Sequence, residues 1–420
     1  MVGTFFAVII AVFLYLFDGE TAANADFLGL TLLGVGSLVL LLSVLILALA
    51  WTPLQKAEKT MTPRLIEMFQ RDHSLHFSHS IVFFFFLLSF AMAIEITTLH
   101  LFPANLVLIA WVIFLGITID SLYRAMKRII GYLNPLHVIH VFSDGAERSI
   151  RAAKEQDLCD WIDTLAETAI KAISSNSTSL ALLAIDKLRL IARNYLHMAK
   201  GITYHEGQER KQQEPGMGEH VSYTLFFLFQ RLEMIFNKAL QEKLEPVCSA
   251  LITTLGKISI YGAEFDVSMI SYPLYYLGKL ANKAQRDRLA EVADHATLTM
   301  LESSKAIVAD VDLRYMEIEE PFLSMIGHMH EIAKETFRQE KSVSIQVIAQ
   351  PFHELNKLFK SEKMASHQDT PAILKRINSV LEEFATLQTV LQTLPPISDL
   401  MKEESLRENK KETPEPPPPV

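Results

Sequence analysis

The sequence predicts an all-α protein in which a group of apolar helices precedes a longer, charged helical region. Residues 1–120 hold only four Lys or Arg residues and are dominated by Leu, Ile, Val and Phe, whereas residues 121–400 have the mixed composition of a water-soluble helical protein. No segment after residue 120 alternates apolar and polar residues between hairpin turns, so strands are not expected there. We predict a transmembrane domain at 1–133, a cytoplasmic helical domain at 134–394 and a disordered tail at 395–420.

Four apolar runs in the first domain have, or approach, the length of a membrane-spanning helix. About 20 apolar residues are needed to cross the ~30 Å hydrocarbon layer, in which backbone polar groups must bond within their own helix. We expect spanning helices at about residues 2–17, 27–51, 81–99 and 101–119. The second run is the clearest, because its 25 residues carry no charge.

The positions of the basic residues predict the orientation of these helices, because Lys and Arg stay on the cytoplasmic side. All four early basic residues lie between the second and third runs, and Arg124, Lys127 and Arg128 follow the fourth. The segments 18–26 and 98–103 contain none. Both termini are therefore expected in the cytoplasm.

The first run has two interpretations. The Ala23-Asn24-Ala25 segment after it looks like a signal-peptidase site, but residues 1–17 lack the Lys or Arg with which signal peptides usually begin. We favour a retained helix and keep a cleaved signal peptide as the alternative. Either interpretation leaves the large helical domain in the cytoplasm.

The segment between the second and third runs resembles a known family. It reads Leu54-Gln55-Lys56-Ala57, then Thr62-Pro63-Arg64-Leu65, then Phe69 and Asp72. This is similar to a block of the bacterial "predicted membrane protein" family, domain of unknown function 2254. In that block Leu-Gln-x-Ala, Ser-Pro-Arg-Leu, an aromatic residue and an Asp lie between two spanning helices.

A second block of that family is matched in part by residues 164–174 and 184–188, without the family's Asn-Asp-Pro core. The resemblance covers about residues 27–190 and implies a bacterial inner-membrane protein. It supplies no activity, because the family has none assigned. The possible motif or interface residues that it implies are Gln55, Thr62, Pro63, Arg64 and Asp72.

The residues of the Thr62-Pro63-Arg64 segment also predict a local structure. Thr is a good N-cap and Pro suits the first helical position, so a helix is expected to begin at Pro63. Its apolar residues would lie on the membrane surface or on a partner helix. Arg64 and Arg71 either meet lipid phosphates or only fix the topology, and we favour the second interpretation.

Apolar residues of the large domain recur at helical spacing. Asp157 and Ser177 are expected to cap two successive helices, the second ending near Gly201. The further helices expected are 221–245, 247–261, 273–284, 286–309, 320–338, 343–360 and 371–393.

The predicted helices form pairs marked by a recurring dipeptide. It occurs as Lys171-Ala172, Lys238-Ala239 and Lys283-Ala284, with Glu335-Thr336 in the fourth place, at spacings of 67, 45 and 52 residues. The first spacing contains a polar insert, 201–220, that is expected to be a mobile loop, so the underlying period is near 47. This period suggests a HEAT-like α-solenoid, with an irregular bundle as the alternative.

The tail 395–420 begins with Pro395-Pro396 and ends in four prolines before Val420. It is expected to be disordered with polyproline II stretches. We favour a solvated tail over a docking motif.

Two histidine groups and one acid are candidate sites. His73, His76 and His79 share one helical face, and His137 and His140 repeat the spacing. Neither group has accompanying ligands at metal-site spacing, so we favour a polar interfacial face over a metal site.

Glu95 is a possible intramembrane functional residue, because an ionisable group inside a bilayer is costly. It lies ~22 Å along the third helix from Ser80, near its outer end. We favour an interfacial carboxylate close to His100 over a residue that conducts ions.

No catalytic or cofactor motif stands out, and a non-enzymatic protein without a cofactor is expected. Cys159 and Cys248 are interpreted as reduced core residues, and the net charge of −9 argues against nucleic-acid binding. The predicted function is a membrane-anchored scaffold whose cytoplasmic helical-repeat surface binds a protein partner. An oligomeric channel or transporter subunit is the alternative, and homo-oligomerisation is left open.

Overall fold

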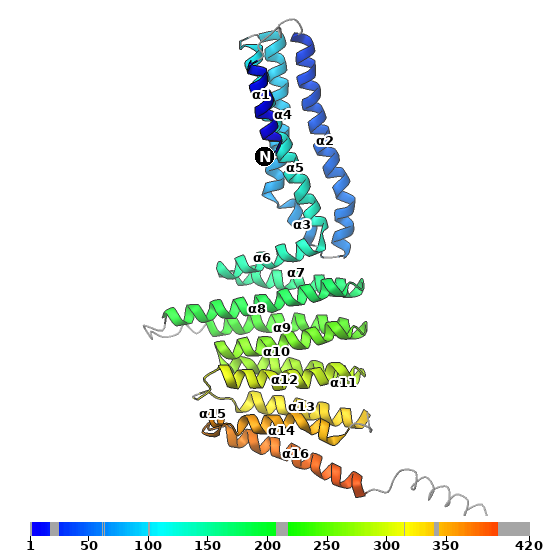
Figure 1. Cartoon of the computed structure of the whole chain (residues 1–420), viewed down its shortest axis with the longest axis vertical. Helices are drawn as coiled ribbons and strands as arrows, with labels where there is room; N and C mark the ends of the chain where they lie inside the picture. The colour runs from blue at the N-terminus through cyan, green and yellow to red at the C-terminus, as the bar shows by residue number, and fades with distance from the viewer. Residues whose placement is uncertain are drawn as a thin grey trace, which may run out of the picture. The chain divides into compact units, whose positions relative to one another are not determined.

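A computed structural model of the chain describes residues 2–16, 25–60, 62, 64–99, 101–206, 217–314, 316–339 and 344–393 (Figure 1). The regular elements of the described residues are all helices, with no strand among them, which confirms the all-α class. The contacts divide the chain into two compact units, Met1–Ile191 and Ala192–Val420, so that the boundary falls inside α8 (Thr178–Glu206).

Unit 1 consists of the apolar helices and the first charged helices. Its elements are α1 (Val2–Leu16), α2 (Ala25–Thr60), α3 (Arg64–Gln70), α4 (His73–Ile94), a π-helical turn η2 (Glu95–Leu99), α5 (Ala104–Leu133), α6 (Pro135–Arg151), α7 (Glu155–Ser174) and the beginning of α8.

Three described helical stretches, and not the predicted four, are long and apolar enough to cross a membrane. They are Asp26–Glu58, His73–Leu99 and Ala104–Leu133. The first apolar run does form α1, but its 15 described residues extend only ~22 Å at 1.5 Å per residue, less than a hydrocarbon layer. The other three helices extend beyond their apolar runs, because charged and polar residues continue the same helix.

The apolar helices form a row in which α1 packs on α5, α5 on α4, and α4 on α2. Small residues lie at the contacts: a Cβ added to Gly116 would be 2.4 Å from the Cβ of Ala7, and one added to Gly36 would be 2.7 Å from the Cβ of Ser89. Small residues let two helix backbones approach closely. Van der Waals contacts can then hold apolar helices together even where the surroundings are as apolar as the helices. The core between the helices consists of Ala7, Leu32, Phe85, Ala93, Ile96, Val107, Trp111 and Val112.

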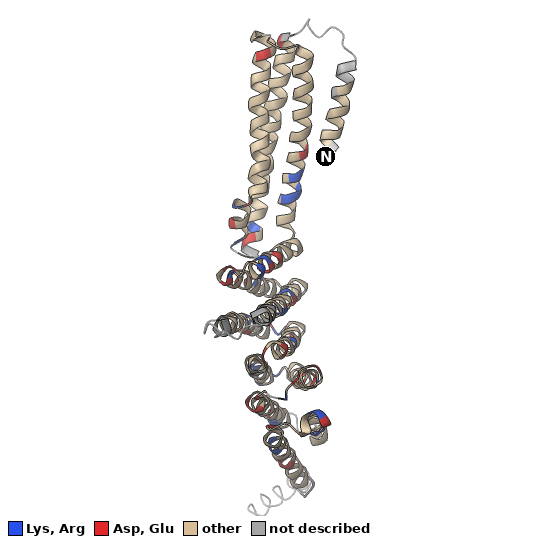
Figure 2. Ribbon diagram, turned by 90° about the vertical axis from the view of Figure 1, so that its left-hand side faces the viewer, with Lys and Arg blue, Asp and Glu red and all other residues tan. Residues whose placement is uncertain are grey.

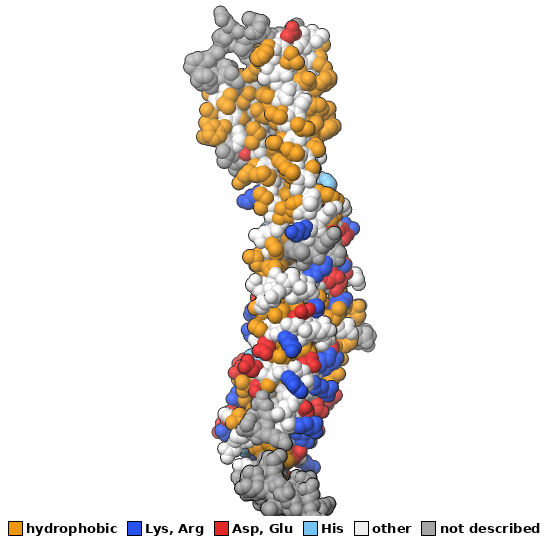
Figure 3. Space-filling model, turned by 90° about the vertical axis from the view of Figure 1, so that its right-hand side faces the viewer, with side chains coloured by type: hydrophobic (Ala, Val, Ile, Leu, Met, Phe, Trp, Pro, Cys, Tyr) orange, Lys and Arg blue, Asp and Glu red, His pale blue; other side chains and the backbone are white. Residues whose placement is uncertain are grey.

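The outer faces of α2, α4 and α5 are apolar. Leu30, Leu41 and Phe77 are 68%, 66% and 68% exposed, and hydrophobic side chains cover this part of the surface in Figure 3. Charged residues are few along these helices and frequent from α6 onward (Figure 2). Exposed apolar surface of this extent is typical of a site that contacts a membrane or another protein.

Unit 2 is a series of helix pairs. It contains the end of α8, α9 (Met217–Gln241), α10 (Glu245–Phe265), a 3₁₀ turn η3 (Val267–Ile270), α11 (Ser271–Arg286), α12 (Ala290–Asp310), α13 (Glu319–Gln339), α14 (Ile345–Phe359), α15 (Glu362–Ala365) and α16 (Thr370–Thr393).

The recurring Lys-Ala pairs mark one repeated turn. The N–H groups of Ser177, Leu244 and Leu289 donate to the carbonyl oxygens of Ala172, Ala239 and Ala284 at 2.8, 2.9 and 2.9 Å. The residues just before these donors, Asn176, Lys243 and Arg288, have φ of 57°, 53° and 63°. This is the Schellman termination of a helix. Each alanine therefore lies in the last turn of the first helix of a pair.

Contacts between neighbouring pairs in unit 2 join residues about one repeat apart. Lys279 Nζ donates to Glu233 Oε2 at 2.9 Å and Asn282 Nδ2 to Glu331 Oε2 at 2.9 Å, over sequence separations of 46 and 49 residues. The Ser303 hydroxyl donates to the Gly256 carbonyl at 3.2 Å, over 47 residues. These separations agree with the predicted period, and unit 2 is a helical, repeat-like array.

The predicted loop 201–220 is wrong at both ends. α8 continues through Gly201 to Glu206, and α9 already begins at Met217. A single Gly inside a helix costs only ~1 kcal/mol, so Gly201 does not end α8. Residues 207–216, the Ala23-Asn24 part of the possible cleavage site and the tail 395–420 lie outside the described residues.

Candidate functional site

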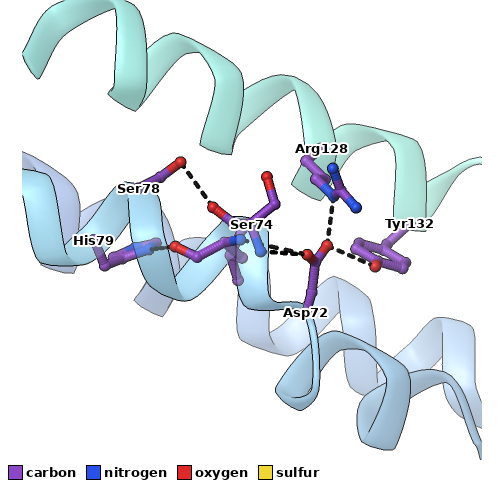
Figure 4. Close-up of polar contacts among 7 residues, drawn as sticks. Asp72, Ser74, Ser78, His79, Arg128 and Tyr132 are labelled. Atoms are coloured by element: carbon purple, nitrogen blue, oxygen red, sulfur yellow. Dashed lines mark hydrogen bonds and ion pairs between the residues drawn. The ribbon is translucent and has the colours of Figure 1, made fainter. Parts of the chain in front are cut away.

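Asp72 is the buried centre of a polar cluster in unit 1 (Figure 4). Its side chain is the N-cap of α4, and Oδ1 accepts from the Ser74 N–H at 3.0 Å. Oδ2 accepts from Arg128 Nε at 2.5 Å and from the Tyr132 hydroxyl at 2.8 Å, both near the end of α5. One carboxylate thus connects the beginning of α4 with the end of α5.

The surroundings of Asp72 favour its charged form. Burial alone would raise the pKa of the carboxyl, but the hydrogen bonds from Tyr132 and Arg128 and the Arg128 charge outweigh it, so the pKa lies below its ordinary value. The N-terminal end of α4 also favours a negative charge. Asp72 is therefore a carboxylate at neutral pH.

The other residues of the family-like block lie nearby. Thr62 is fully buried, and its hydroxyl oxygen accepts from the Arg64 N–H at 3.4 Å, a long version of the predicted N-cap. Arg64 Nη1 donates to the Asp160 carbonyl at 3.0 Å and Nη2 lies 3.5 Å from the Asp160 carboxylate on α7. Gln55 is exposed on α2, and Pro63 lies outside the described residues.

Helix α3 packs on the protein with its apolar face. Leu65 and Phe69 are buried, and the Phe69 ring meets the Tyr132 ring edge-on at 5.8 Å between centroids. Arg71 pairs with Glu67 one turn away at 2.9 Å. The sequence predicted that this apolar face lies either on the membrane surface or on a partner helix. The described contacts of this face are with other helices of unit 1.

A further contact ties the end of α2 to the charged helices. Lys171 Nζ on α7 donates to the Glu58 carbonyl at 3.3 Å. With Arg64–Asp160, it links the apolar helices of unit 1 to α7. The junction of α2, α3, α4, α5 and α7 is therefore held by polar contacts, and most of the family-like residues lie in it. Such an arrangement can transmit a position or an orientation from one helix to another.

The histidines near the beginning of α4 contact backbone carbonyls. His76 Nε2 lies 2.5 Å from the Gln70 oxygen, and His79 Nδ1 lies 2.8 Å from the Leu75 oxygen. The His137 ring lies against Gly131, where an added Cβ would be 3.0 Å from it. In the described part of the chain no three His, Cys, Asp or Glu side chains are grouped as metal ligands.

Glu95 has a local contact at the other end of α4. It begins the π-helical turn, and Oε1 accepts from the Phe102 N–H at 2.8 Å. Its predicted neighbour His100 lies outside the described residues. The carboxylate thus supports the connection from α4 to α5.

Three residues of unit 1 were missed by sequence reasoning. Asp120 on α5 is 5% exposed and accepts from the Gly3 and Thr4 N–H groups at 2.9 and 3.0 Å and from the Thr4 hydroxyl, so it caps α1. Asp120 is the first residue after the fourth apolar run, and this position is the feature of the sequence that could have pointed to it. Nothing in the sequence indicated that Arg128 and Tyr132, four residues apart on α5, both donate to Asp72.

Comparisons with known proteins add little. No family model matches the chain, and no curated protein matches it. A solved structure described as a "Circular tandem repeat protein with novel repeat topology and enhanced subunit contact surfaces" has 13% identity and a TM-score of 0.38, over 86% of this chain and 84% of that one. A likeness at this level carries no argument, and the resemblance to the domain of unknown function 2254 family stays a prediction.

Proposed function

We propose that the chain is a membrane-anchored scaffold whose helical-repeat unit binds a protein partner. The apolar outer faces of α2, α4 and α5 support the anchor, with α1 as a short fourth helix against α5. The distribution of Lys and Arg supports cytoplasmic termini. In this proposal the membrane is the bacterial inner membrane, and the repeats of unit 2 form a HEAT-like solenoid.

The observation that carries the proposal is a group of exposed aromatic and Met side chains on two neighbouring helices, which we term the aromatic face. It comprises Tyr223, Phe226 and Met234 of α9 and Tyr272 and Tyr275 of α11, each 43% to 60% exposed. Tyr, Phe and Met are enriched in protein interfaces, and buried aromatic anchors supply much of the binding energy.

The aromatic face is held in place by packing beneath it. The Tyr275 ring meets the rings of Tyr276 and His328 edge-on, at 5.6 and 5.9 Å between centroids. The Tyr276 ring stacks on Phe229 at 5.5 Å. Rigid aromatic side chains lose little conformational entropy on binding, which suits them to a docking surface.

Photo-crosslinking in native membranes tests the scaffold. A photoreactive residue in place of Tyr275 should capture a defined protein, and one in place of the exposed Lys257 on α10 should not. Identical products from both positions, or none from Tyr275, would contradict the proposal. The capture should persist after the membranes are washed with salt, because the aromatic face binds through apolar contacts.

The membrane topology has its own test. A reporter active only in the cytoplasm should be active when fused after Leu133 or at Val420 and silent at Ala23. Activity at Ala23 would overturn the proposed layout.

The channel alternative has less support. The Glu95 carboxylate on which it rested accepts the Phe102 N–H, and Phe83 and Phe84 on the same helix are exposed apolar residues. A residue that lines a polar pathway needs polar neighbours or water to offset its desolvation.

A further inference from the structure

The first helices of the pairs in unit 2 all run in one direction, and α16 continues the series. Lys283 Nζ contacts Asn237 Oδ1 at 3.1 Å between the ends of α11 and α9. Gln285 Nε2 lies 3.4 Å from Gln339 Oε1 between the ends of α11 and α13. The carboxyl ends of α9, α11 and α13 therefore lie at one edge of unit 2 (Figure 1).

α16 ends at the same edge. Its beginning meets the beginning of α13, where Asp369 Oδ2 accepts from the Ile318 N–H at 2.8 Å. Further along both helices, Lys334 Nζ lies 2.7 Å from Glu383 Oε1. The two helices are thus parallel, and the chain leaves α16 at Thr393 on the edge where α9 and α11 end.

This edge carries a polar hollow of about 450 Å³ between α9 and α11. Its lining residues are Asn237, Leu240, Gln241, Lys283, Arg286 and Asp287. Lys283 Nζ also donates to Glu233 at 2.7 Å, whereas the exposed Arg286 makes no ion pair with any described residue. Because Lys283 is already paired with Glu233, the Arg286 guanidinium is the group of the lining that favours an anionic ligand.

The aromatic face begins next to this hollow. Going back along α9 from Gln241, Met234 comes first and Tyr223 last, which is a rise of ~27 Å over 18 residues. On α11, Tyr275 and Tyr272 accompany them. A ligand that enters from the edge meets basic groups first and exposed rings next.

We propose that the acidic, proline-rich segment 412–420 of this chain docks along α9 and α11. Its sequence is Glu-Thr-Pro-Glu-Pro-Pro-Pro-Pro-Val, with two carboxylates and no base. Glu412 and Glu415 lie in the hollow near Arg286, and the four following prolines lie on the aromatic face. Nine residues of polyproline II extend ~28 Å at 3.1 Å per residue, which matches the hollow and the aromatic face together.

A proline-rich segment is a suitable ligand for the aromatic face. A polyproline II segment is already extended before it binds, so it loses little entropy, and aromatic-lined grooves are the usual receptors for it. Proline has no N–H, and its free carbonyl oxygens need donors. The Tyr272 and Tyr275 hydroxyls and the Gln230 and Gln241 amides can supply them.

The tail is long enough to reach this surface. α16 packs on α13, α13 on α11 and α11 on α9, so the path crosses three interaxial distances of about 8–10 Å each, or ~30 Å. The 18 residues from 394 to 411 can span about 60 Å when extended. The segment can therefore bind within its own chain.

Docking of the tail would cover the surface that is proposed for the protein partner. Its role as a regulator rests on the proposed function, but the docking itself involves this chain alone. A partner would then bind only by displacing the tail, and the affinity of the partner would rise when the tail is deleted.

Photo-crosslinking of the purified full chain in detergent tests the docking. A photoreactive residue in place of Val420 should give a monomeric product crosslinked to α9 or α11, as mapped by mass spectrometry. Arg286→Glu should lower the yield about tenfold, equivalent to ~1.4 kcal/mol. Glu412→Gln with Glu415→Gln should lower it similarly, and these changes cannot unfold unit 2 because they lie in the tail. Lys257→Glu is the control and should leave the yield unchanged.

Crosslinks to other helices, a dimeric product from the tail of a second copy, or a yield insensitive to both sets of changes would overturn the proposal. The two proposals fail separately. Loss of the tail crosslink with partner capture at Tyr275 intact refutes docking alone. A tail crosslink in the full chain, with no partner capture at Tyr275 even after residues 412–420 are deleted, refutes the scaffold alone.

Discussion

Two glycines in the two units permit close helix contacts in different ways. A Cβ at Gly116 in unit 1 would be 2.4 Å from the Cβ of Ala7 and 2.8 Å from the Gly3 carbonyl oxygen, so backbone meets backbone. A Cβ at Gly278 in unit 2 would be 2.2 Å from the His328 ring. At Gly116 the apolar helices pack closely through small residues. At Gly278 the side chain of a neighbouring repeat helix fills the space above the glycine.

The units also differ in how their acidic side chains are partnered. In unit 1, Asp72 and Asp120 each accept several hydrogen bonds at a helix terminus. In unit 2, Glu233 and Glu383 bridge bases on neighbouring helices one repeat apart. Capping fixes single helix ends in unit 1, and bridging fixes the spacing between repeats in unit 2.

The largest expected effect is at Asp72. Asp72→Ala removes the N-cap of α4 and leaves Arg128 and the buried Tyr132 hydroxyl without their acceptor, so unit 1 should lose about 3 kcal/mol of stability. Thermal unfolding in detergent measures the loss. Asp312→Ala is the control, because the Asp312–Arg314 pair is exposed, and it should leave Tm unchanged. Equal shifts for both variants would contradict the capping role.

Gly116→Ala tests the backbone contact of α1 with α5. The added methyl group meets atoms that cannot rotate away, so we expect a loss of about 2 kcal/mol. Gly34→Ala is the matched control on α2, because nothing lies within 4 Å of its added Cβ. The same detergent unfolding assay, with limited proteolysis of α1, reports the outcome. A variant as stable as the control would mean that α1 does not pack closely on α5.

Gly278→Ala should also cost about 2 kcal/mol, because the added Cβ would lie 2.6 Å from the His328 Cβ, which a change of rotamer does not move. Gly327→Ala on α13 is its control, with nothing within 4 Å of the added Cβ. Hydrogen exchange of α11 and α13 measures the change locally. Stability equal to that of the control would mean that His328 does not fill the space beside Gly278.

A change of pH should distinguish the units. Burial lowers the pKa of both His328 and His330, and the Lys334 charge lowers that of His330 further. The unfolded chain therefore takes up protons first as the pH falls below about 6.5, and stability of unit 2 declines between about pH 7 and 5. The pKa of Asp72 lies below 3.8, so its contribution to unit 1 persists above that pH and is lost only as the pH falls through the lowered value.

Hydrogen exchange at pH 7 and 5, corrected for the intrinsic rate, measures this difference. α13 should lose protection at pH 5, and α4 should not. Replacing His328 by Asn and His330 by Phe should abolish the change in α13. An equal loss in both helices would show that another titration dominates.

The smallest expected effect is at Glu95. Glu95→Gln keeps an oxygen that can accept the Phe102 N–H, so structure and stability should be unchanged within about 0.5 kcal/mol. Neither the variant nor the wild type should conduct ions in reconstituted vesicles. Reproducible conductance that the substitution abolishes would favour the channel over the scaffold.

Local signals in the sequence were enough to predict much of this protein. The all-α class follows from helical spacing, and the Lys-Ala pairs correctly marked equivalent positions of the repeat because each Ala lies in a helix-terminating turn with short-range hydrogen bonds. Thr62 was predicted as a cap for the same reason, since its partner is two residues away. The predicted cap at Asp157 is wrong, because α7 begins at Glu155 with Lys154 at the N-cap and Asp157 lies inside its first turn. Such features depend on neighbours in the sequence, which periodicity and capping preferences describe.

The tertiary structure decided which distant residues meet. Asp72 bonds to Arg128 and Tyr132 over 56 and 60 residues, and Asp120 caps α1 over 117 and 116 residues. No local preference encodes these partners, because they depend on which faces of α1, α4 and α5 pack together. The same packing places α9 beside α11, although the exposed rings of the two helices are 46 to 52 positions apart in the sequence. The sequence by itself therefore determined the helices and their repeat, and only long-range packing determined the polar junction and the aromatic face.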